Sequence, residues 1–131
     1  MEHQRLTNKE VKKKNRNQIF RYICTHETVS NPDIVSDLHL SLPTVTNTTR
    51  ELLESGLLRD LGEMQSTGGR RARALCAASD YRFSIGLDIT RNHLGILLLN
   101  LTGDIIKYER MQLGFSRSSA YFSEVCQKID D

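Results

Sequence analysis

The sequence lacks a long hydrophobic run. No apolar stretch approaches the roughly 20 residues that a helix needs to cross a bilayer. The first residues are polar and contain no apolar segment of the kind found in secretory signal peptides. We therefore expect a protein without membrane contact and with a cytoplasmic location.

Cysteine is also scarce. The three cysteines, Cys24, Cys76 and Cys126, are odd in number and far apart, and they form neither a Cys-x-x-C pair nor a Cys/His cluster with metal-site spacing. This usage argues against a disulfide framework and indicates a reducing compartment. From the sequence we expect no metal, no cofactor and no catalytic residue, and hence a protein that is not an enzyme.

The net charge of +2 over 131 residues conceals an uneven distribution. Residues 5–21 contain seven basic residues and one acid, and residues 70–73 contain three arginines. Between these clusters, residues 27–56 contain five acids and one arginine. Separated basic clusters are typical of a protein that binds a polyanion. A solvated helix surface would also explain the charges at residues 9–16.

The N-terminal half of the chain predicts three helices. Ile19, Phe20 and Ile23 have the spacing of one buried stripe on a helix from about residue 9 to 25. The helix that follows should be short, because Ser30 and Asp33 form a capping box at its start and its apolar residues end near residues 38–40.

A second cap follows within a few residues. Ser41 and Pro43 have the types favoured at the cap and in the first turn of a helix, and Gly56 provides a stop after Ser55. Two helices joined by so short a connection predict a helix-turn-helix.

The last of these helices has two chemically different sides. The side predicted to pack inward contains Val45, Thr49, Leu52 and Leu53. The opposite side contains Thr44, Asn47 and Arg50, flanked by Thr46 and Thr48. Short hydrogen-bonding side chains can reach base edges in a major groove. A merely solvated helix would more usually carry Lys and Glu there, because they are better helix formers.

Beyond Gly56 the sequence predicts a β-hairpin, with strands before and after the turn at residues 66–71. Gly68 and Gly69 would let the backbone approach a phosphate closely. Arginines at 70, 71 and 73 would supply positive charge for a minor groove and planar donors for phosphate oxygens. A polar, flexible hairpin tip is the alternative. Helices and hairpin together predict a winged helix-turn-helix domain over residues 1–78.

From Tyr81 onward the pattern changes to three strands and a helix over residues 117–130. The run Leu97, Leu98 and Leu99 predicts a strand buried on both sides. So short a segment cannot cover both faces of a sheet, so residues 79–131 are interpreted as the truncated beginning of a larger domain. The predicted fold class is therefore α+β, a winged helix followed by a partial β-β-β-α segment.

These features together resemble the N-terminal part of ROK-family transcriptional repressors. The resemblance runs from about Lys12 onward, and its strongest elements are Ser-Thr-Gly-Gly-Arg-Arg at 66–71 and Gly-Leu-Asp at 86–88. It implies a winged helix-turn-helix joined to an actin-like domain of the sugar-kinase type. It further implies a repressor of sugar-metabolism genes that senses a sugar or sugar phosphate.

Two departures from the family pattern concern the second domain. The zinc-binding cysteine-rich motif and the sugar-contacting residues of the family would lie beyond Asp131, so most of a sugar-effector site is absent from this chain. Sugar kinases of the family have an Asp-x-Gly-x-Thr loop for phosphate, whereas this chain has Thr90 in place of that glycine. A β-branched residue there argues against close phosphate approach.

We therefore predict a homodimer that binds double-stranded DNA at a palindromic operator. The predicted base contacts are Thr44, Thr46, Asn47 and Arg50. The predicted contacts to the DNA backbone are Ser41, Lys12, Lys13 and Lys14, and those to phosphates or the minor groove are Arg70, Arg71 and Arg73.

The sheet edge of residues 79–131 should pair with a second chain. Two alternatives remain. The winged helix could bind a protein, as the acidic stretch 27–56 allows, or the chain could be a fragment of an ATP-dependent sugar kinase.

Overall fold

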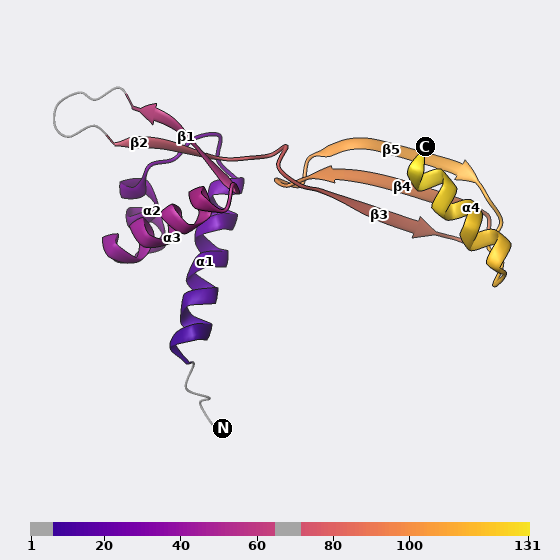
Figure 1. The fold of residues 1–131 in the computed structure, drawn as a ribbon, viewed down its shortest axis with the longest axis horizontal. Helices are drawn as coiled ribbons and strands as arrows, with labels where there is room; N and C mark the ends of the chain where they lie inside the picture. The colour runs from indigo at the N-terminus through magenta and orange to yellow at the C-terminus, as the bar shows by residue number, and fades with distance from the viewer. Residues whose placement is uncertain (1–6, 65–71) are drawn as a thin grey trace. The chain divides into compact units, whose positions relative to one another are not determined.

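The computed structural model describes residues 7–64 and 72–131, which form four helices and two small antiparallel sheets (Figure 1). The predicted α+β class is confirmed. The chain divides into two compact units, Met1–Ser79 and Asp80–Asp131. No helix in the described part of the chain is long and apolar enough to span a membrane.

The first unit begins with three helices, α1 (Asn8–Cys24), α2 (Asn31–Leu38) and α3 (Leu42–Glu54). Each helix begins after a hydroxyl residue whose side chain accepts a backbone N–H of the first turn, namely Thr7, Ser30 and Ser41. At α2 the predicted capping box is present, because the Asp33 carboxylate in turn accepts the Ser30 N–H at 2.8 Å.

Residues 39–41 connect α2 to α3. His39 caps α2 in the left-handed conformation, with φ of 53°, and thereby ends the helix. Gly56, with φ of 76°, turns the chain after α3 as predicted. These local features give the α2–α3 pair the connection of a helix-turn-helix.

A hairpin of β1 (Leu58–Glu63) and β2 (Arg73–Ala77) follows α3. The register shifts between Asp60 and Gly62, where β1 bulges and Gly62 adopts φ of 94°. The hairpin is tied to the helices by Val29, which exchanges backbone hydrogen bonds of 2.9 and 2.7 Å with Leu75. This bridge attaches β2 to the segment between α1 and α2.

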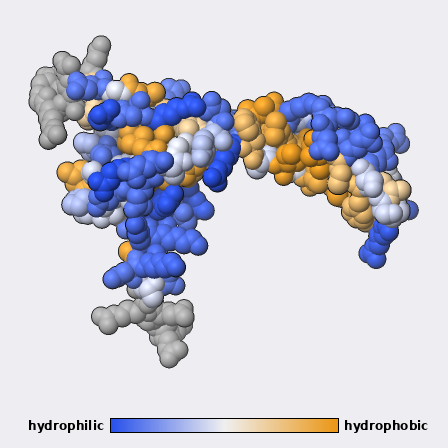
Figure 2. Space-filling view, viewed as in Figure 1, coloured by the Kyte–Doolittle hydropathy of each residue, from blue (hydrophilic) through white to orange (hydrophobic). Residues whose placement is uncertain are grey.

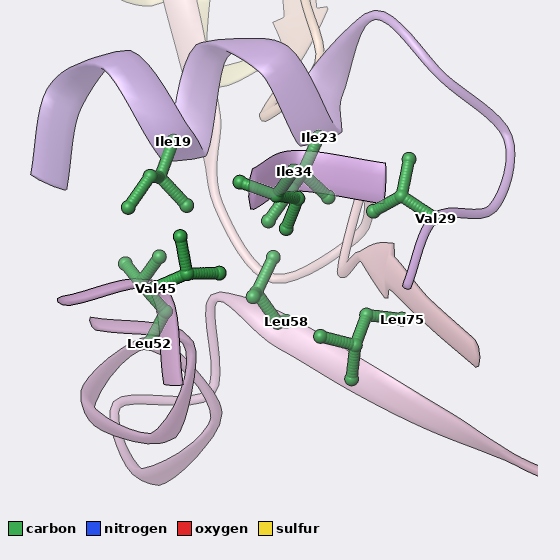
Figure 3. Packing of buried hydrophobic residues seen from close by; sticks show 8 residues of the cluster. All are labelled: Ile19, Ile23, Val29, Ile34, Val45, Leu52, Leu58 and Leu75. Atoms are coloured by element: carbon green, nitrogen blue, oxygen red, sulfur yellow. The ribbon is translucent and has the colours of Figure 1, made fainter. Parts of the chain in front are cut away.

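One core holds these five elements together. Its buried apolar residues come from every helix and from both strands, as Figure 3 shows: Ile19, Ile23, Val29, Ile34, Val45, Leu52, Leu58 and Leu75. Each of them is at most 3% exposed. Because α3 contributes to this core from one side, its opposite side lies at the surface.

The second unit contains β3 (Phe83–Ile89), β4 (His93–Asn100), β5 (Ile105–Gln112) and α4 (Ser119–Asp130), and its strands are ordered β3-β4-β5. Its core is small. Leu94 of β4 packs with Tyr121 and Val125 of α4, and partly buried residues of β4, β5 and α4 surround them.

Much of this sheet is exposed. The odd-numbered apolar residues of β3 share one face of that edge strand and are 40–55% exposed: Phe83, Ile85, Leu87 and Ile89. Figure 2 shows apolar side chains gathered over these strands. The predicted burial of Leu97, Leu98 and Leu99 on both sides is wrong, because all three are partly exposed and α4 is the only helix described in this unit.

Candidate nucleic-acid interface

The exposed ridge of α3 carries Asn47 and Arg50. One terminal nitrogen of Arg50 donates a hydrogen bond of 2.9 Å to Oδ1 of Asn47, and both residues are exposed. This contact uses the Asn47 amide oxygen as an acceptor and leaves its NH₂ group as a donor. The ridge therefore presents two neighbouring donor groups in a defined arrangement.

The buried side of α3 includes a residue that the sequence analysis placed on the outer side. Thr48 is 6% exposed and lies with Val45, Thr49 and Leu52 in the stripe that faces the core. These four positions have the i, i+3, i+4, i+7 spacing of one helix side, so the prediction that Thr48 flanks the outer side is wrong. The neighbouring Thr49 is satisfied in the core by hydrogen bonds of 3.0 Å to the Val45 carbonyl and 3.1 Å to Asn31.

A groove of about 410 Å³ separates the ridge from α1. Its lining includes Lys12, Asn15, Thr44, Asn47 and Glu51. The ammonium group of Lys12 lies 2.7 Å from the Glu51 carboxylate and so links α1 to α3. The hydrogen bond from Lys12, assisted by the charges of Arg16 and Arg50, lowers the pKa of Glu51. Lys12 and Glu51 therefore largely neutralise each other beside the ridge.

The structure does not bring all three predicted lysines to this groove. Lys13 and Lys14 lie on a different side of α1, where they line a shallow surface together with Asn17, Gln18 and Arg21. Only Lys12 of the three is in contact with the groove beside Thr44 and Asn47. The basic cluster of α1 is thus divided between two surfaces.

Ser41 and Thr44 form the N-terminal end of the ridge. Ser41 Oγ accepts the Thr44 N–H at 3.4 Å and lies 2.8 Å from the Thr44 hydroxyl. The first turn of α3 contains no acidic residue. The positive end of the helix dipole is therefore not offset by a carboxylate of that turn, which suits an anion.

A second groove, of about 610 Å³, separates the ridge from the hairpin. Thr46 and Arg50 of α3 face Asp60 and Arg73 of the two strands across it. Nε of Arg73 lies 2.5 Å from Oδ2 of Asp60. The structure thus brings the predicted residue Arg73 beside two predicted residues of α3.

The remaining hairpin predictions fall outside the described residues. They concern Gly68, Gly69, Arg70 and Arg71.

The sequence analysis did not identify Glu51 and Asp60, the acids that pair with predicted basic residues. Lys12 and Glu51 are 39 positions apart, and no local pattern signals their contact. The Asp60–Arg73 pair could have been suspected from hairpin geometry, since residues on paired strands lie opposite each other. In the observed register, however, Asp60 is opposite Leu75 and Arg73 is opposite Glu63, so the Asp60–Arg73 contact is diagonal and spans the bulge.

In the second unit, charged side chains of both signs line a groove of about 280 Å³ between the sheet and α4: Lys107, Glu109, Lys128, Asp130 and Asp131. Thr90 closes the turn between β3 and β4, since its hydroxyl donates to the His93 carbonyl at 3.1 Å and accepts the His93 N–H at 3.1 Å. Across the described ranges, no group of three or more His, Cys, Asp or Glu side chains is arranged to hold a metal ion.

Comparison with known proteins gives a consistent result. The chain is 30% identical over 103 residues to the DNA-binding transcriptional dual regulator NagC of Escherichia coli K12, covering 79% of this chain and 25% of NagC. It is 30% identical over 106 residues to the xylose repressor of Caldicellulosiruptor bescii, covering 79% of this chain and 27% of that protein. No family model matches the chain.

A solved structure also matches in fold. It is a ROK-family transcriptional regulator, a homologue of the E. coli MLC protein, with a TM-score of 0.66 and 18% sequence identity over 92% of this chain and 31% of that structure. The chain spans about a quarter of the length of the curated relatives that it matches. In sequence and in fold, this chain is therefore a relative of the ROK-family transcriptional regulators.

Proposed function

We propose that this chain is the DNA-binding part of a transcriptional repressor of sugar-metabolism genes. The observation that carries the proposal is the groove in which Thr46 and Arg50 of α3 lie beside Arg73 of the hairpin. A helix ridge with short polar side chains, next to a hairpin with an arginine, suits the simultaneous contact of bases and backbone. The names of the relatives, NagC and xylose repressor, support regulation of sugar metabolism.

In this proposal the N-terminal half of α3 enters the major groove. Asn47 and Arg50 contact base edges, and Thr44 and Thr46 contact bases on either side of them. Because Arg50 already donates to Oδ1 of Asn47, the two side chains act as one donor surface. Guanine, with two acceptors on its major-groove edge, is the base that such a surface prefers.

Backbone contacts complete the interface. The positive end of the α3 dipole, next to Ser41, faces a phosphate. Arg73, together with Arg70 and Arg71, contacts phosphates or the minor groove. Lys12 shields the Glu51 carboxylate from the DNA through its ion pair. Lys13 and Lys14 contribute long-range attraction from the other side of α1.

The bound form is a homodimer on a palindromic operator. The edge strands β3 and β5 and the exposed apolar row on β3 offer surface for a second chain. Two-fold symmetry of the protein then requires two matching half-sites in the DNA. In a longer protein that includes this chain, a sugar or sugar phosphate would act as the effector.

Selection from a random duplex pool with the full chain tests this function. The selected sequences should be palindromic, and binding should weaken steeply with salt. Asn47→Ala should remove the preference at one position of each half-site, where about 1–3 kcal/mol of discrimination is expected. Asn17→Ala, on the α1 surface away from α3, is the matched control and should leave the preference unchanged.

Three results would contradict the proposal. The first is no duplex binding by the full chain at low salt. The second is binding that does not depend on salt, which would favour a protein-binding module. The third is an equal loss of affinity for every duplex sequence on Asn47→Ala, which would remove Asn47 from the set of base contacts.

A further inference from the structure

Asp60 lines the groove between α3 and the β1–β2 hairpin. One carboxylate oxygen, Oδ1, accepts the Gly62 N–H at 2.8 Å, within the bulge of β1. The other, Oδ2, contacts Nε of Arg73 at 2.5 Å across the hairpin. The Asp60 side chain is 24% exposed, whereas that of Arg73 is 70% exposed. The acid is therefore fixed to the backbone and partly covered, and the arginine extends from it towards solvent.

We propose that Asp60 is a positioning residue that orients the Arg73 guanidinium for contact with the DNA backbone. This inference rests on the proposed function, and it assigns to an acid a favourable role in binding a polyanion. The same groove contains Thr46 and Arg50 of α3. In this proposal, the oriented Arg73 therefore contacts the backbone of the DNA strand whose bases α3 contacts.

The chemistry of the guanidinium explains how one acid can help. A guanidinium has five N–H donors in one plane, and Asp60 engages the one on Nε. The four N–H groups on the two terminal nitrogens remain for another acceptor. Two parallel N–H groups match the spacing of two phosphate oxygens. Because the side chain is already held, less rotamer freedom is lost when the phosphate binds.

A second effect of Asp60 lowers the affinity for DNA. A carboxylate near DNA repels phosphates, so its removal should strengthen binding if charge alone matters. At a separation of about 8 Å in water and 0.15 M salt, that repulsion changes affinity by less than about twofold. Loss of a preoriented arginine contact changes affinity by about three- to tenfold. The favourable effect of orienting Arg73 is therefore larger than the repulsion between Asp60 and the phosphates. Weaker binding on removal of the Asp60 charge indicates positioning, and tighter binding indicates repulsion.

The carboxylate remains charged under ordinary assay conditions. The hydrogen bond from the Gly62 N–H, with further help from Arg73, holds the pKa of Asp60 below its usual value. The role of Asp60 therefore does not depend on pH near neutrality.

The test is a double-mutant cycle in the full chain, with Asp60→Asn, Arg73→Ala and both together. Asparagine keeps an oxygen for the Gly62 N–H but removes the charge that holds Arg73. The probes are a nonspecific 20-base-pair duplex and the duplex selected from the random pool, each titrated over a salt series. Asp60→Asn should weaken binding by about three- to tenfold. It should also lower the slope of log affinity against log salt by about 0.9, the value of one phosphate contact.

In the Arg73→Ala background, Asp60→Asn should produce no further weakening, because no arginine remains to be oriented. Glu54→Gln is the matched control: it removes an exposed acid at the end of α3 and should strengthen binding by less than about twofold. Far-ultraviolet circular dichroism checks that each variant is folded.

Tighter or unchanged binding of Asp60→Asn would overturn the inference while leaving the proposed function intact. Equal weakening with and without Arg73 would also overturn it, since Asp60 would then act through the shape of the hairpin. A chain that binds no duplex at all would overturn both the inference and the function on which it rests.

Discussion

Met1–Ser79 packs three helices and a hairpin around one core, whereas Asp80–Asp131 places one helix on three strands. The first core contains eight buried apolar residues and the second only three. Large apolar side chains along β3 and β5 stay exposed instead, from Phe83 to Tyr108. The first unit is stabilised by its own interior, and the second keeps apolar surface that its own residues do not cover.

The largest expected effect on stability comes from replacing one leucine by alanine in each unit. Leu52→Ala removes a side chain that is 1% exposed in the first core and should cost about 2–5 kcal/mol of unfolding free energy. Leu87→Ala, at a site that is 44% exposed on β3, should cost less than about 1 kcal/mol.

Urea unfolding of the full chain measures this difference. Circular dichroism at the helix band follows mainly the first unit, which contains three of the four described helices. Tyrosine fluorescence follows mainly the second, because it contains Tyr81, Tyr108 and Tyr121 and the sequence has no tryptophan. Equal costs for the two substitutions would show that the β3 row is covered in solution.

A smaller effect is expected at the start of α2. Ser30 is 4% exposed, and its hydroxyl contacts the Asp33 carboxylate at 2.6 Å as part of the capping box. Ser30→Ala should therefore cost about 1 kcal/mol, measured as a shift of the helix transition in urea. Ser36→Ala changes the same residue type at an exposed position within α2 and should cost nothing, because alanine is the better helix former. A loss of similar size at both sites would argue against the cap.

The helices could be predicted because their signals are local. Ser30 with Asp33, Ser41 with Pro43, and Gly56 each fix an end of a helix through residues at most three positions apart. The strands were predicted from the same kind of local signal. The relation to ROK-family regulators rested on residues in sequence order, and it too is confirmed.

The burial of single residues and the ion pairs could not be predicted in the same way. Thr48 is polar yet faces the core, because the helix is positioned by Val45 and Leu52 on either side of it. The partial exposure of Leu97–Leu99 depends on how many elements cover the sheet, which the strand itself does not encode. The Lys12–Glu51 and Arg73–Asp60 pairs depend on tertiary packing and on a bulge.

The smallest expected effect compares two tyrosine hydroxyls. In the first unit Tyr22 donates a hydrogen bond of 2.6 Å to Asp37 and so joins α1 to α2. In the second unit the hydroxyl of Tyr121, which is 4% exposed, has no hydrogen-bond partner among the described residues. Tyr22→Phe should cost less than about 1 kcal/mol, since the bond is exposed to solvent. Tyr121→Phe should cost nothing or stabilise by up to about 1 kcal/mol, because it removes an unpaired buried group.

A pH titration of phenolate absorbance tests the Tyr22 half of this comparison independently. The hydrogen bond to Asp37 raises the pKa of Tyr22 from 10.0 to about 12. The neutral phenol is therefore favoured in the folded chain, so its contribution to stability is complete below about pH 10 and is lost as the pH rises towards 12. Tyr22→Phe should therefore remove a step near pH 12 from the absorbance titration of the folded chain. If the step near pH 12 is unchanged in Tyr22→Phe, Tyr22 is not the group that the hydrogen bond to Asp37 holds neutral.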